Sequence, residues 1–311
     1  MLYKPRRYLE KASYFLVSTA NRILDLLRAL RHDLIFIQRE AFPYGPPIFE
    51  KLLARLDKPI IYDFDDAIYL PQASKANKLF IFLKNSQKTK EIIRLSQQVI
   101  VGNDHLKEYA IRYSENVTMI PTVIDTDRYL ISEPRSSDIV TLGWIGSHST
   151  LPYLNLVETA LRQLSKRYDI LLRIVGGEYH LEGVQVDNRT WSLQDEVSHL
   201  QSFDIGLMPL LDDERARGKC GFKALQYMAV GVPCVCSPVG VNREIVQDGY
   251  NGYLAGNEDE WIEKFSILIE SPDLRCKLGL RGRATVEERY SVKANFPKLL
   301  TVLKTAARHS L

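Results

Sequence analysis

Short apolar runs alternate with segments of helical periodicity along most of this 311-residue chain. The runs 170–175 (ILLRIV) and 234–237 (CVCS), for example, are apolar at neighbouring positions, which is typical of strands buried on both faces. Such strands belong to parallel sheets covered by helices, so the pattern predicts an α/β fold. The expected strands are residues 33–38, 59–64, 98–101, 117–120, 139–145, 170–175, 189–192, 204–209 and 234–237. The expected helices include residues 150–167, 272–280 and 282–290.

The alternation is interrupted once, between Val123 and Asp138, where aspartate, serine and proline replace the periodic apolar residues. We therefore expect a linker here and two Rossmann-like domains, 1–133 and 134–311. A chain of this length allows each domain its own core.

The first segment, 3–31, has apolar residues at mostly helical spacing and four basic residues near its start. An amphipathic helix of this kind can lie on an anionic membrane surface, or it can cover a sheet. No stretch approaches the ~20 apolar residues that span a bilayer, and no signal peptide opens the chain. We expect a cytoplasmic protein, with peripheral contact at the inner face of the membrane as the alternative for this helix.

Composition excludes some partners. The net charge of +3, without a basic run or interleaved aromatic residues, gives no support for nucleic-acid binding. The four cysteines do not have the spacing of a zinc site, and we expect buried thiols in a reducing compartment and no metal.

The strongest local signal is residues 214–237, a basic loop with glycines followed by a helix at about 222–230 and an apolar strand. The amino terminus of a helix has free N–H groups and a positive dipole end, which suit a phosphate. Arg217, Lys219 and Lys223 gather at this point, and Gln226 lies one turn after Lys223. We interpret the segment as an anion site in which these cations neutralise a diphosphate.

Two other loops follow expected strands of the second domain. Gly146, which precedes Ser147, has no side chain, so backbone can approach a diphosphate there. Trp191 can stack on a nucleotide base, or it can be part of the core.

In the first domain, Asp63, Asp65 and Asp66 follow the strand 59–64, and Arg39 and Glu40 follow the strand 33–38. Ligands of parallel sheets bind at these strand ends, so the carboxylates can contact a sugar or acceptor. They can also cap a helix or bind a divalent cation, and Arg39 with Glu40 can form a surface ion pair.

Three ordered motifs resemble the GT-B glycosyltransferases, most closely family GT4 (glycosyl transferases group 1). Residues 226–235 (QYMAVGVPCV) are similar to the family run E-A-M-A-x-G-x-P-V-V, and residues 240–252 to G-x-x-E-I-V-x-D-G-x-N-G. Residues 120–129 (IPTVIDTDRY) are similar to the run that ends the family's first lobe.

The resemblance implies two Rossmann-like domains facing a cleft, with the nucleotide held by the second and the acceptor by the first. It implies a retaining glycosyltransferase that moves a sugar from a nucleoside-diphosphate donor to an acceptor hydroxyl, in glycan or cell-surface polysaccharide synthesis, without a dedicated metal. The last helix, expected at 293–308, would return to the first domain.

The implied donor residues are Gly146, Ser147, Trp191, Arg217, Lys219, Lys223 and Gln226, and the implied acceptor-side residues are Arg39, Glu40 and Asp63. Asp65, Asp66 and Lys223 are the implied catalytic residues, with Asp65 near the anomeric carbon.

The chain also departs from the family. It has Gly218 and Gln226 where many members have two glutamates, and we expect a shortened first lobe, since a helix precedes its first strand. The alternative function is therefore a non-catalytic nucleotide-sugar-binding or scaffold protein derived from a glycosyltransferase.

Overall fold

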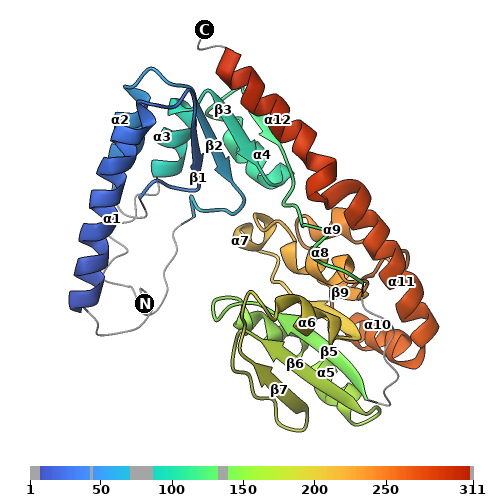
Figure 1. Ribbon diagram of the computed structural model, residues 1–311. Helices are drawn as coiled ribbons and strands as arrows, with labels where there is room; N and C mark the ends of the chain where they lie inside the picture. Colours follow the sequence, from blue (N-terminus) through green and yellow to red (C-terminus); the bar gives the residue numbers. More distant parts are fainter. Residues whose placement is uncertain (1–7, 43–44, 71–86, 132–138, 309–311) are drawn as a thin grey trace. The chain divides into compact units, whose positions relative to one another are not determined.

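The computed structural model describes residues 8–42, 45–70, 87–131 and 139–308, and the chain forms two compact units (Figure 1). Unit 1 comprises residues 1–121 and 297–311, and unit 2 comprises residues 122–296. The units therefore divide between Pro121 and Thr122, whereas the sequence pattern places the division at 133/134, in a stretch outside the described residues. The segment 122–131 joins unit 2 because Ile124 pairs with Ser291 and the Tyr129 hydroxyl bonds to Glu196.

Unit 1 is a four-stranded parallel sheet in the order β1-β2-β3-β4. Its elements are α1 (Tyr8–Ala29), β1 (Ile35–Gln38), α2 (Ile48–Ala54), β2 (Ile60–Phe64), α3 (Lys88–Leu95), β3 (Gln98–Val101), α4 (Asp104–Ala110) and β4 (Val117–Met119).

Apolar side chains of these strands form the core of unit 1. On one face, Ile61 and Ile100 pack against Val302 and Ala306, which lie in the last turns of α12 (Val292–Arg308). The final helix, expected at 293–308, thus contributes its last turns to unit 1.

Helix α1 has an exposed apolar stripe. Ala29 is buried, whereas the exposed large residues on this helix and just after it are Leu16, Val17, Ile23, Leu24, Leu27 and Leu30. Because they are exposed, these side chains do not cover a sheet within the described residues, which differs from the expectation that this helix covers a sheet. The described helices include none that is long and apolar enough to cross a membrane.

Unit 2 has a six-stranded parallel sheet in the order β10-β9-β8-β5-β6-β7. Its strands are β5 (Val140–Ile145), β6 (Ile170–Val175), β7 (Gln185–Arg189), β8 (Ile205–Met208), β9 (Cys234–Cys236) and β10 (Tyr253–Leu254). Its helices are η2 (Leu151–Val157), α5 (Glu158–Ser165), α6 (Glu196–Gln201), α7 (Glu214–Arg217), α8 (Phe222–Ala229), α9 (Asn242–Ile245), α10 (Glu258–Glu270), α11 (Pro272–Thr285), η3 (Val286–Tyr290) and the start of α12.

Close packing in unit 2 depends on a glycine at the place where helix α8 lies on strand β8. A Cβ on Gly206 of β8 would lie 2.4 Å from the ring of Tyr227, so this glycine lets α8 lie directly on the sheet. The buried hydroxyl of Tyr227 donates to the carbonyl of Leu207 and accepts from the N–H of Ile145. Helix α8 is thereby fixed across β5 and β8.

Four predicted elements of unit 2 differ from the structure. The strand expected at 189–192 lies earlier, at β7, where the sequence QVDNR at the sheet edge has no apolar run to reveal it. The helix expected at 150–167 is divided into 3₁₀ helix η2 and α5. The two helices expected at 272–280 and 282–290 are one helix, α11, continued by the π-helical η3.

Candidate active site

The sheet of unit 2 reverses its strand order at β5, which pairs with β6 on one side and β8 on the other. Connections leave the carboxyl ends of these strands in opposite directions, and ligands of doubly wound sheets bind at such a point. Gly146 and Ser147 follow β5 directly, and the segment after β8 leads to α8. The predicted donor residues of both segments therefore belong to the switch point of this sheet.

Gly221 is the N-cap of helix α8, and its φ of 68° lies in the left-handed region that glycine adopts readily. A Cβ at this position would also lie 2.3 Å from Cδ1 of Ile245, so a larger residue would displace the Ile245 side chain. The first N–H groups of α8 have no partner within the helix, and the positive end of the helix dipole lies at the same point. Lys223 is in this first turn.

Lys223 lies against two residues of β5 and its loop. Its Nζ is 5.4 Å from the centre of the Trp144 ring, and its Cε would lie 2.9 Å from a Cβ on Gly146. Burial, and then the neighbouring charge of Lys219, lower the pKa of Lys223 to about 8. The site thus holds a cation that is supported by an aromatic ring and destabilised by a second cation, an arrangement that favours an incoming anion.

The other expected donor residues have different surroundings. Lys219 is half-buried and close enough to Lys223 to influence it. Arg217 is exposed, and its Nε forms an ion pair of 2.7 Å with Asp212. Ser147 is exposed, and its hydroxyl contacts that of Ser149 at 2.8 Å. Lys219 and Lys223 are therefore the predicted cations that the structure brings together.

Gly146 and Gly176 bring three loops together. Gly176, with a φ of 89°, lies so close to Gly146 that a Cβ on it would be 2.2 Å from the Gly146 carbonyl oxygen. The same Cβ would lie 3.4 Å from Cβ of Trp191. The loops after β5, β6 and β7 thus meet at the carboxyl ends of these strands. Trp191 is 46% exposed there.

Sequence reasoning missed the residues that hold this loop. The indole Nε1 of Trp191 donates to Oε2 of Glu196 at 2.8 Å, and the hydroxyl of Tyr129 donates to Oε1. Tyr129 also shares a hydrogen bond with Gln226, which is buried. Gln226 was expected to contact a ligand group, and its partner in the structure is this tyrosine. The spacing of Trp191 and Glu196 gave no signal, because Trp191 lies in a loop without a regular period and Glu196 is only the first residue of α6.

In unit 1, the structure brings Arg39 to two of the three predicted carboxylates. Its guanidinium lies 3.2 Å from Asp66 and 3.9 Å from Asp65, and the backbone N–H of Arg39 donates to the Asp63 carbonyl. Burial, and then the charge of Asp65, raise the pKa of Asp63 to about 6. Glu40, which follows Arg39, is half-buried, and burial, followed by the charge of Glu40, raises the pKa of Tyr62.

Two alternatives for this carboxylate cluster find no support in the described residues. Residues 65–70 form bends and turns rather than a helix, so none of the three aspartates caps one there. In the part of the chain that the structure describes, no three histidine, cysteine or carboxylate side chains are placed to hold a metal ion. Of the cysteines, Cys276 is exposed, contrary to the expectation of buried thiols, while Cys220, Cys234 and Cys236 are buried.

The two parallel-sheet units define the GT-B fold, in which each of two Rossmann-like domains has its own sheet. The structure is similar to that of HepE from Anabaena in complex with UDP and glucose, with a TM-score of 0.68 and 15% identity over 91% of this chain and 80% of that one. It is also similar to a glycosyltransferase from Rickettsia africae, with a TM-score of 0.67 and 15% identity over 94% of this chain and 82% of that one.

Residues 139–271, which lie within unit 2, match the family model "Glycosyl transferases group 1". Among curated proteins, N-acetyl-alpha-D-glucosaminyl L-malate synthase of Bacillus anthracis is 30% identical over 114 residues, which are 35% of this chain. The match covers only 29% of the length of that relative.

Proposed function

We propose that this chain is a retaining glycosyltransferase that moves a sugar from a nucleoside-diphosphate donor to an acceptor hydroxyl, in the synthesis of a glycan or polysaccharide. The observation that carries the proposal is the pair formed by Lys219, just before α8, and Lys223, in the first turn of α8 and beside Gly146 at the switch point of the sheet. Negative charge grows on the leaving diphosphate in the transition state, and preorganised cations stabilise that charge. The fold is similar to that of HepE, whose structure holds UDP and glucose, and this supports a nucleoside diphosphate as the ligand.

The remaining roles follow from the same reaction. Gly146 and Ser147 would allow backbone near the diphosphate, Trp191 would stack on the base, and Arg217 would add charge at the rim. Asp65 and Asp66, with Asp63, Arg39 and Glu40 around them, would contact the sugar or acceptor, and no dedicated metal is needed. Asp65 would stabilise positive charge at the anomeric carbon.

The test is the turnover of two lysine variants. Lys219→Ala and Lys223→Ala are each expected to lower donor turnover roughly 10²-fold, the effect of removing one preorganised electrostatic partner. Release of nucleoside diphosphate from a panel of UDP- and GDP-sugars measures it, and the exposed Lys166 provides a matched control, Lys166→Ala. Wild-type turnover in both site variants would refute the proposal.

A second candidate is a nucleotide-sugar-binding protein without catalysis. It is favoured by one observation, that Gly218 and Gln226 stand where many family members have glutamates. Calorimetry with nucleotides, combined with a donor-hydrolysis assay, separates the two candidates, because binding without turnover supports the second.

A further inference from the structure

A buried carboxylate, Glu196, connects two aromatic side chains that lie far apart in the sequence. Its Oε2 accepts the hydrogen bond of Trp191 at 2.8 Å, and its Oε1 accepts that of Tyr129. Glu196 is only 7% exposed, and Nη2 of Arg128 lies 3.9 Å from Oε1. Burying a carboxylate is costly unless donors satisfy both oxygens, and here the donors come from two segments of the chain.

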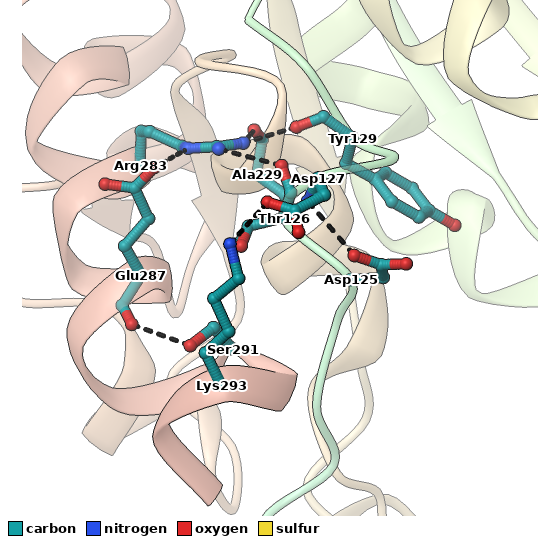
Figure 2. Close-up of polar contacts among 9 residues, drawn as sticks. All are labelled: Asp125, Thr126, Asp127, Tyr129, Ala229, Arg283, Glu287, Ser291 and Lys293. Atoms are coloured by element: carbon teal, nitrogen blue, oxygen red, sulfur yellow. Dashed lines mark hydrogen bonds and ion pairs between the residues drawn. The ribbon is translucent and has the colours of Figure 1, made fainter. Parts of the chain in front are cut away.

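Tyr129 is itself fixed at both ends. Figure 2 shows its carbonyl turned toward Arg283, whose guanidinium also donates to the carbonyls of Thr126 at 2.9 Å and Ala229 at 2.5 Å. Burial, and then the hydrogen bond to Glu196, raise the pKa of Tyr129 to about 12, so its hydroxyl keeps its proton and remains a donor. The Glu196 carboxylate is therefore bonded, through Tyr129, to a segment whose position is fixed.

The other partner of Glu196 is different, because Trp191 is 46% exposed and belongs to the loop after β7. The same loop is held by a second contact, from Nη2 of Arg128 to the carbonyl of Leu193 at 2.7 Å. A ring that is exposed on its surface and fixed through its N–H has few orientations available, so it can stack on a flat ligand without losing much entropy.

We propose that Glu196 is a positioning residue of the donor site, which fixes the Trp191 indole as a platform for the base of a nucleoside diphosphate. This inference rests on the proposed function, since it concerns the base end of the same ligand whose diphosphate would contact Lys219 and Lys223. Glu196 touches no reacting atom, and it acts through Trp191 alone.

The test compares ligands with and without a base. Binding of UDP, GDP, ADP and inorganic diphosphate is measured by calorimetry for the wild type, Glu196→Ala, Glu196→Gln and Trp191→Phe. Glu196→Ala should weaken the preferred nucleoside diphosphate about 10-fold, a size expected when base stacking is impaired, and should leave inorganic diphosphate unchanged. Glu196→Gln should restore most of the affinity, because an amide can accept from the indole and donate to the Tyr129 oxygen.

Two more measurements keep the test decisive if Glu196→Ala folds poorly. Trp191→Phe keeps an aromatic ring but loses the N–H, so it should weaken the nucleoside diphosphate and leave inorganic diphosphate unchanged. Adding Glu196→Ala to Trp191→Phe should then cost little more. Trp144 and Trp261 are buried, so exposure of Trp191 to acrylamide quenching reports its orientation, and quenching should increase in Glu196→Ala.

Glu263→Gln, an exposed exchange of the same kind on α10, is the control for Glu196→Gln. The inference is overturned if Glu196→Ala binds the nucleoside diphosphate as the wild type does, or loses it and inorganic diphosphate in equal proportion. If the wild type binds neither ligand, the proposed function itself fails, and the two failures are thus distinguishable.

Discussion

The side chain of Lys223 lies directly against the backbone of Gly146. A Cβ built on this glycine would be 2.9 Å from Lys223 Cε and 2.6 Å from the ring of Trp144. Lys223 can therefore lie beside the Trp144 indole only because residue 146 has no side chain. The same lack of a side chain leaves room for a ligand.

Gly146→Ala tests this contact. The added methyl group must displace Lys223 or Trp144, and overpacking of this kind costs about 1–3 kcal/mol. We expect a lower melting temperature and weaker binding of inorganic diphosphate. Gly256→Ala is the control, because the nearest atom to its Cβ would be an ordinary 3.5 Å away. Equal behaviour of the two variants would contradict the contact.

The lowered pKa of Lys223 predicts opposite effects of pH on binding and on stability. As pH rises through about 8, the folded protein loses this proton, so affinity for inorganic diphosphate should fall. Over the interval up to the ordinary pKa of 10.5, the unfolded chain holds more protons than the folded one, so the free energy of unfolding of the ligand-free protein should rise with pH.

Calorimetry and chemical denaturation across pH 7–10 measure both trends. Lys223→Arg is the comparison, because a guanidinium keeps its charge throughout this range. Its affinity should show a smaller decrease, and the same decrease in both proteins would assign the effect to another group.

The raised pKa of Asp63 predicts a pH effect in unit 1. Between its ordinary pKa of 3.8 and about 6, the folded state binds more protons than the unfolded state, so this residue lowers stability as pH rises through that interval. Asp63→Asn removes the buried charge, and it should raise the melting temperature more at pH 7 than at pH 5. The exposed Asp33 supplies the control, Asp33→Asn. A gain that is the same at both pH values would count against the assignment.

Arg283 should be important for the stability of unit 2. Its guanidinium joins the carbonyls of Thr126, Tyr129 and Ala229, and its Nε pairs with Glu287 at 2.6 Å (Figure 2). Arg283→Met keeps the aliphatic length and leaves these carbonyls without their donor, which should cost about 2–4 kcal/mol.

Urea denaturation gives this loss, and amide hydrogen exchange should show reduced protection in residues 122–131. Arg243→Met, at an exposed site on α9, should change stability by about 0.5 kcal/mol or less. Unchanged protection of 122–131 in Arg283→Met would show that other contacts hold the segment.

Much of the parallel-sheet architecture could be predicted from the sequence, because buried strands leave a local record. The predicted runs 98–101 and 170–175 match β3 and β6 at both ends, since all their residues except Gln98 and Arg173 are apolar. The edge strand β7 could not be found in this way, because its partly solvated side chains are polar.

The residues of the candidate site fall into the same two groups, those with a local sequence pattern and those without one. Lys219 and Lys223 could be found because they flank a helix start with glycines, which is a local pattern. Glu196, Tyr129 and Arg283 could not, since the contact between Tyr129 and Glu196 joins positions 67 residues apart, and the contact between Arg283 and Tyr129 joins positions 154 apart. Such pairs exist only after the chain has folded.

The position of Lys223 over an indole has a practical consequence for handling the protein. An aromatic face attracts a cation but does not neutralise it as a carboxylate would, and the adjacent Lys219 adds to the local positive potential. Small oxyanions in the buffer, such as sulfate or phosphate, should therefore compete for this spot, and purification in a chloride buffer of low ionic strength should preserve the most sensitive measurements of the natural ligand.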